Sequence, residues 1–199
     1  MVPLWAVLVT KIKRSMKRKV LLILFAGFIC SMVTLAQESN RSFYQQSLIN
    51  RLFIELDVTG STTNKATRLM SLGGKIGFDI TPNLYVFAKG EGLMALRDAN
   101  GAKSYGNGAN LGGGLGVRFL KINFSNGKSS FESDMSVYAM MAASVGNTDW
   151  KQTVYEAGLK WKLGKRLAPT LGLGFRHTNS HTVGVPNHNG MVGSIGICF

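Results

Sequence analysis

Cysteine, proline and acidic residues are all scarce in this chain of 199 residues. There are two cysteines, and Cys30 lies in a segment that we predict to be removed, so Cys198 can form neither an intramolecular disulfide nor a cysteine metal cluster. The prolines after residue 36 fall in expected turns, loops or strand starts. Ten acidic residues stand against 23 lysines and arginines, and no acid follows Glu156. A disulfide framework is therefore excluded.

Residues 16–36 have the pattern of a secretory signal peptide. Three basic residues follow Met16, an apolar core covers 20–29, and a small-residue site ends at Ala36. We predict a signal peptide over 1–36, with Met16 as an alternative start and cleavage after Ala36. An uncleaved membrane anchor is the alternative, although the apolar run is short for a span. Cleavage removes six bases and no acid, so the net charge falls from +13 to +7. We therefore expect no nucleic-acid partner.

Beyond a short periplasmic leader over 37–50, apolar residues recur at every second position, which is the period of a β-strand. The pattern appears in eight segments separated by turn signals, and almost nothing in the chain has a helical period. Short connections alternate with longer ones, as in barrels whose turns lie on one side of a membrane and whose loops lie on the other. We predict an all-β fold for 51–199: an eight-stranded antiparallel up-and-down transmembrane β-barrel.

The two faces of these segments differ in charge. The apolar face carries hardly any charge, whereas the opposite face collects six acids and six bases. Inside a narrow barrel these charges would pair and fill the lumen, leaving no open pore. A soluble up-and-down barrel with the apolar face inside is the structural alternative. The predicted lumen charges are Glu55, Asp57, Lys75, Asp79, Lys89, Glu91, Arg118, Asp134, Glu156, Lys160, Lys162 and Arg176.

Aromatic residues support the membrane interpretation. Phe78, Phe119, Trp161 and Phe199 fall outward near the same end of alternate segments, which is typical of the girdle at a membrane interface. The last segment, "GMVGSIGICF", has apolar residues at every second position back from Phe199. With the signal peptide and the eight segments, it resembles the small eight-stranded outer-membrane barrels of Gram-negative bacteria.

That resemblance covers 51–199 and implies location in the outer membrane. It also implies that the carboxyl-terminal strand ending at Phe199 is recognised by the outer-membrane insertion machinery. Outer-membrane lipid and lipopolysaccharide would be partners, and we expect a monomer. The scaffold hosts adhesins, anchors, pores and lipid-modifying enzymes, so it is poor guidance on function. Bases expected on the extracellular side could meet lipopolysaccharide phosphates: Lys65, Arg68, Arg97, Lys103 and Lys151.

All three histidines, His177, His181 and His188, fall in "GLGFRHTNSHTVGVPNHNG". Alternation places His177 and Asn179 outward. The stretch also resembles the lipid A deacylase barrels, in which a His-x-Ser-Asn motif precedes a Pro-Asn pair. His177 would match the catalytic histidine, and 186–187 would match the Pro-Asn pair. However, Asn179 stands in place of the serine, Ser180 is out of frame, and no acid is available to orient the histidine.

We therefore expect a structural, adhesive or envelope-stabilising barrel without catalysis, cofactor or metal. Two alternatives remain at this point. One is a lipid A acyl-ester hydrolase that uses His177 with Asn179 or Ser180, and the other is a small solute pore. Metal binding by the three histidines is disfavoured, because the loop offers no carboxylate.

Overall fold

The computed structural model describes residues 47–63, 67–98, 108–125, 130–146, 151–164, 167–182 and 187–199. The predicted signal peptide, its cleavage site and most of the predicted leader lie outside these residues. A 3-10 helix, η1, covers Leu48–Arg51 and precedes the first strand. None of the described residues belongs to a helix that is long and apolar enough to cross a membrane. The strands are β1 (Leu52–Thr63), β2 (Thr67–Asp79), β3 (Leu84–Asp98), β4 (Gly108–Ser125), β5 (Ser130–Ser144), β6 (Gln152–Leu163), β7 (Ala168–Ser180) and β8 (His188–Cys198).

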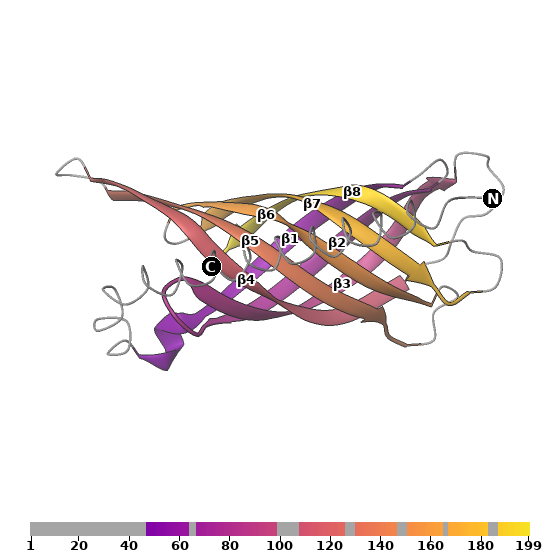
Figure 1. Ribbon diagram of the computed structural model, residues 1–199, viewed down its shortest axis with the longest axis horizontal. Coiled ribbons are helices and arrows are strands. Elements are labelled where there is room, and N and C mark those ends of the chain that lie inside the picture. The colour runs from indigo at the N-terminus through magenta and orange to yellow at the C-terminus, as the bar shows by residue number, and fades with distance from the viewer. Residues whose placement is uncertain are drawn as a thin grey trace, which may run out of the picture. The chain divides into compact units, whose positions relative to one another are not determined.

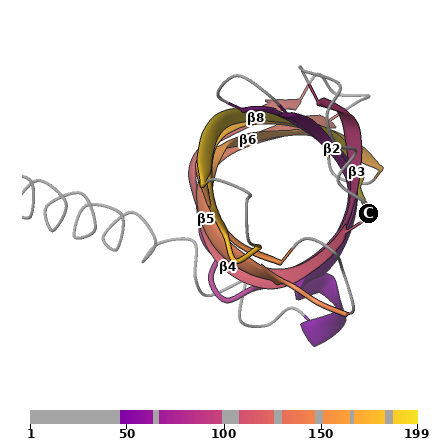
Figure 2. The same ribbon diagram turned by 90° about the vertical axis from the view of Figure 1, so that its right-hand side faces the viewer.

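The strands form one closed sheet in sequence order. Each strand pairs antiparallel with the next, and β1 pairs with β8 to close the barrel (Figures 1 and 2). The predicted eight-stranded antiparallel up-and-down β-barrel is confirmed. The seam between β1 and β8 runs from Glu55 opposite Cys198 to Thr63 opposite Gly190, and the N–H of Phe199 donates to the carbonyl of Ile54 at 2.8 Å. The described wall of the barrel therefore has no open edge along this seam.

The strand register fixes the tilt of the barrel. Following paired residues once around the sheet from Asp134, through Lys162, Thr170, Gly196 and Asp57, leads back to β5 at Ser144, ten residues further along. With about 3.3 Å per residue and about 4.8 Å between strands, a stagger of ten gives a tilt of about 40°. Each residue then rises by about 2.5 Å along the barrel axis.

Side chains alternate between the two faces as the period of two predicts. On β1, Leu52, Ile54 and Leu56 are between 51% and 55% exposed, whereas Glu55 and Asp57 are 1% and 2% exposed. The same contrast between an exposed apolar face and a buried polar face recurs on the other strands. The apolar face is therefore outside, which contradicts the arrangement expected for a soluble barrel with an apolar interior.

One region of the wall extends further than the sequence pattern indicated. The fourth segment of the pattern ends at Phe119, but β4 continues to Ser125 and β5 begins at Ser130. The ladder between them shifts register between Arg118 and Leu120, which is the signature of a β-bulge. The bulge interrupts the alternation, so the continuation of β4 was not recognisable from the period alone.

Candidate functional site

Eight charged side chains form one continuous chain of ion pairs across the lumen. Four are acids and four are bases, so this ionic chain as a group carries no net charge. Each of these side chains is at most 12% exposed. In order, the chain runs Lys160, Glu55, Lys75, Asp57, Lys89, Glu91, Arg176, Glu156.

The distances show where the chain is tightest. Lys75 lies 2.7 Å from Asp57 and 3.6 Å from Glu55, whose other oxygen is bonded to Lys160. Lys89 lies 3.6 Å from Asp57 and 3.2 Å from Glu91, which is on the same strand. Arg176 closes the series at 3.1 Å from Glu91 and 2.6 Å from Glu156. Every ion therefore has at least one counterion, as buried charges require.

Local register explains part of this arrangement. Glu55 sits opposite Lys75, and Glu156 sits opposite Arg176. Lys75 is also opposite Lys89, an arrangement of like charges that is unfavourable by itself. Asp57 lies within 4 Å of both ammonium groups and relieves this repulsion. Space for its carboxylate exists because residue 73 is glycine: a Cβ there would lie 2.5 Å from Asp57 Oδ1.

Neutral polar groups complete the environment of the carboxylates. Glu91 accepts hydrogen bonds from Asn110 at 3.0 Å and from Ser71 at 3.3 Å. Tyr138 donates its hydroxyl to Glu156 at 2.7 Å, and Thr170 donates to Glu55 at 2.9 Å. Most of these neutral partners occupy inward positions of the period-two pattern, but no other feature of the sequence distinguishes them from other polar residues.

Aromatic and aliphatic side chains pack inside the barrel beside the ionic chain. Phe53, Tyr85 and Phe87 form aromatic contacts, with ring centroids 5.6 and 6.1 Å apart. Tyr85 and Phe87 belong to one buried cluster with Met140 and Val154. These side chains occupy part of the lumen of the described barrel.

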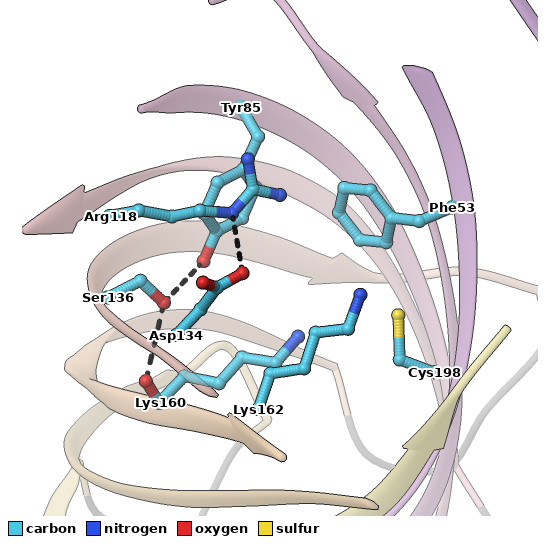
Figure 3. A pocket seen from close by; sticks show the side chains of 8 residues that line it. All are labelled: Phe53, Tyr85, Arg118, Asp134, Ser136, Lys160, Lys162 and Cys198. Carbon is cyan, nitrogen blue, oxygen red and sulfur yellow. Dashed lines mark hydrogen bonds and ion pairs between the residues drawn. The ribbon is translucent and has the colours of Figure 1, made fainter. Parts of the chain in front are cut away.

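A second charged group lies at the barrel end where β1 begins. Arg118 pairs with Asp79 at 2.7 Å and with Asp134 at 3.9 Å, and these carboxylates are 21% and 24% exposed. The guanidinium also lies 4.9 Å from the centre of the Tyr85 ring. Figure 3 shows Arg118, Asp134 and Tyr85 beside a small pocket. Its lining consists of Phe53, Tyr85, Arg118, Asp134, Ser136, Lys160, Lys162 and Cys198.

The structure thus places eleven of the twelve charges predicted for the lumen in two groups. Eight form the buried chain, and Arg118, Asp79 and Asp134 form the group at the mouth. The twelfth, Lys162, lines the pocket between Asp134 and Thr170, its register neighbours. Eleven of the twelve make ion pairs with other members of the set.

The histidines of the candidate esterase site lie at the opposite end, on the outer face. His177 Nδ1 is 2.5 Å from Asn189 Oδ1, and its ring centre is 6.2 Å from that of Tyr155. His181 Nε2 is 2.8 Å from the hydroxyl of Thr153. These contacts join β6, β7 and β8 in a row of polar and aromatic groups.

The three candidate catalytic residues are not assembled into a nucleophile and a base. Asn179 shares the outward frame of His177, but Ser180 is one residue out of frame, as alternation predicts. Ser180 Oγ accepts a hydrogen bond from the N–H of Thr182, while its own N–H donates to Asn187. The partner of His177 is an amide rather than a carboxylate, so no anion orients the imidazole. The described residues contain no cluster of histidine, cysteine and acid that could hold a metal.

The aromatic residues expected at one interface lie on the outer face near the start of β1. Phe119 and Trp161 are each 42% exposed, and Phe199 is 54% exposed. Phe78 is partly exposed and pairs with Leu52 in the register. The indole N–H of Trp161 donates to the hydroxyl of a serine on β5 at 2.5 Å. An amphipathic ring with a satisfied donor is suited to a membrane interface.

Comparisons with known proteins give fold relatives only. No family model and no curated protein matches the chain. The N-terminal β-barrel domain of OprF from Pseudomonas aeruginosa is similar at 11% identity, with 74% of this chain and 97% of that chain covered and a TM-score of 0.42. Neisserial surface protein A is similar at 14% identity, with 74% and 95% covered and a TM-score of 0.43. Both are small eight-stranded outer-membrane barrels of Gram-negative bacteria, the class that the sequence resembles.

Proposed function

We propose that this protein is an outer-membrane β-barrel with a closed lumen that serves as a structural, envelope-stabilising element. One observation carries the proposal: every strand presents exposed apolar side chains on its outer face. The most exposed examples on each strand are Leu56, Ile76, Val86, Leu111, Met141, Leu159, Leu173 and Ile195.

The height of this band fits a membrane. Strands of 11 to 13 residues, such as β1, β7 and β8, rise by about 2.5 Å per residue and reach about 27 to 32 Å. The apolar band of an outer-membrane barrel is about 25 Å tall. In water, so large an apolar surface around the whole circumference would favour aggregation. Contact with lipid removes this apolar surface from water and so removes the tendency to aggregate.

The filled lumen supports a structural role over a solute pore. Its eight buried ions are neutral as a group and bonded to one another, so they present no charge that attracts a permeating ion. Aromatic rings and buried aliphatic side chains pack beside these ions. We therefore propose that the protein acts through the contacts of its outer wall with lipid and not through transport of solutes along its lumen.

The partners proposed for such a barrel follow from its surfaces. Outer-membrane lipid and lipopolysaccharide would surround the apolar band, and the insertion machinery would recognise the strand that ends at Phe199. We propose a monomer, because the β1–β8 seam closes the wall and leaves no edge there for a second copy.

Fractionation tests the proposal. The full-length chain, expressed in a Gram-negative host, should be recovered with outer membranes and should migrate differently on gels before and after heating. Recovery as a soluble periplasmic monomer would contradict it. In planar bilayers the purified protein should show conductance near zero, and stable channel openings would favour a pore. Cells with the protein should also exclude a hydrophobic dye better than cells without it.

A further inference from the structure

The β4–β5 hairpin is the longest ladder in the barrel and extends beyond the other strands. Pairing of β3 with β4 ends at Leu84 opposite Val117, and pairing of β5 with β6 ends at Ser133 opposite Leu163. The β4–β5 ladder continues to Ser125 opposite Ser130. At about 2.5 Å of axial rise per residue, β5 continues about 8 Å past the end of its ladder with β6, and β4 continues about 20 Å past the end of its ladder with β3. Figure 1 shows this extension at the left.

The extension has one apolar face, which points outward. Leu120 is 41% exposed and Phe131 is 46% exposed, and Ile122 lies between them in the same frame. The other face carries the polar side chains of Asn123 and Glu132, which pair in the register. The apolar face begins at Phe119 and Leu120, directly below the exposed band of β4, so the two surfaces are continuous.

Contacts at its base hold the extension in this orientation. Arg118 donates to Asp79 at 2.7 Å and to the carbonyl of Pro82 at 3.2 Å. Lys121 donates to the same carbonyl at 2.7 Å. These bonds join the inner side of the hairpin to the turn between β2 and β3. The apolar face is therefore presented away from the barrel axis.

We propose that this extension, comprising 119–125 and 130–133, lies in the headgroup layer of the membrane leaflet at the end where β1 begins, with its apolar face toward lipid. The inference rests on the proposed membrane location. Two physical limits place it there. Within the described residues, β3 does not pair with β4 beyond Val117, and backbone groups left unpaired on that edge are costly in hydrocarbon. The apolar face, in turn, is unfavourable in bulk water.

The dimensions agree with this position. The headgroup layer on each side of a bilayer is about 5–8 Å thick, so an extension of about 8 Å on β5 and about 20 Å on β4 is long enough to cross it. In this layer water can bond the unpaired edge of β4 while the apolar face contacts the ends of the acyl chains. Trp161 lies at the same level, where its indole is bonded to Ser133 at the base of the hairpin.

Spin labels at single cysteines test this placement. Cys198 is first replaced by alanine, and labels are then introduced by Phe131→Cys on the apolar face and by Asn123→Cys on the polar face. The full-length chain is expressed, and the labelled barrels are placed in phosphatidylethanolamine and phosphatidylglycerol vesicles. Collision rates with oxygen, which concentrates in lipid, and with a water-soluble nickel complex are measured. We expect a higher oxygen-to-nickel ratio at Phe131→Cys than at Asn123→Cys.

A third label, Leu159→Cys, separates the two proposals. It lies in the apolar band, 47% exposed in the structure, and should give the highest ratio of the three. If it instead collides freely with nickel, the membrane location itself fails. If it is protected while Phe131→Cys and Asn123→Cys have equal ratios, only the placement of the hairpin is overturned. Dipolar broadening at Phe131→Cys would show that a second copy covers this face and would also overturn the proposal. Heat-modifiable migration verifies that each variant is folded.

Discussion

Neutralising Glu91 is the sharpest test of the ionic chain. Its carboxylate contacts Lys89 at 3.2 Å and Arg176 at 3.1 Å, and it accepts two further hydrogen bonds. Glu91→Gln keeps the shape of the side chain but leaves these two cations with one counterion each. Removal of one partner of a buried ion pair costs about 3–5 kcal/mol, and we expect a loss of that size in the free energy of unfolding.

The matched control is Asp79→Asn at the mouth of the barrel. Asp79 also pairs with an arginine, but its side chain is 21% exposed and the arginine retains Asp134. Solvent screens this pair, so the expected loss is about 1 kcal/mol or less. Both variants are measured by urea unfolding of the purified protein in lipid vesicles, followed by circular dichroism and by heat-modifiable migration.

A double-mutant cycle makes the test more specific. Lys89→Met removes the cation next to Glu91, so Glu91→Gln in that background should cost less than it does alone, with a coupling of about 0.5–3 kcal/mol. Equal losses of unfolding free energy for Glu91→Gln and Asp79→Asn would contradict this prediction. In that case the lumen charges would behave as hydrated ions, and the lumen would not be dry.

Three further predictions concern other parts of the molecule. Gly73→Ala should lower the urea midpoint clearly, because the new Cβ would lie 2.5 Å from a lumen carboxylate, whereas Gly60→Ala, with nothing within 4 Å, should have little effect. Leu159→Arg should destabilise the folded barrel in vesicles by about 2–4 kcal/mol, because it places a charge within the apolar band; Leu167→Arg, in the turn before β7, should be close to neutral. Lipid A incubated with the purified protein should keep its acyl pattern by mass spectrometry, and a loss of acyl chains that His177→Ala abolishes would establish the esterase alternative.

Most of the fold was predictable because a single periodicity determines it. Apolar residues at alternate positions place one face of each strand outside, and an even number of strands allows antiparallel closure. The contacts across the lumen were not predictable in the same way. Glu91 meets Arg176, 85 residues later and on a strand that is not its neighbour, and this meeting depends on the stagger of the closed sheet. No local pattern in the sequence encodes that stagger.

The β4–β5 extension shows a different limit. Leu120 and Ile122 continue an alternating pattern, but the bulge at Phe119 shifts its frame by one residue. A search for strict alternation therefore ends the segment at the bulge. At the candidate esterase site, in contrast, alternation alone was sufficient. It predicts that His177 faces outward and that Ser180 lies out of frame with it, and the register between β6 and β7 has the same arrangement.

The ionic chain also links stability to closure of the barrel. Glu55 on β1 bonds to Lys160 on β6, and Glu91 on β3 bonds to Arg176 on β7. These strands are not neighbours in the sheet, so neither pair can form within a hairpin. Before closure, each ion must keep its own hydration, and burial without its counterion is costly. The pairs therefore favour the fully closed barrel over partly assembled sheets, which is the property that the proposed structural role requires.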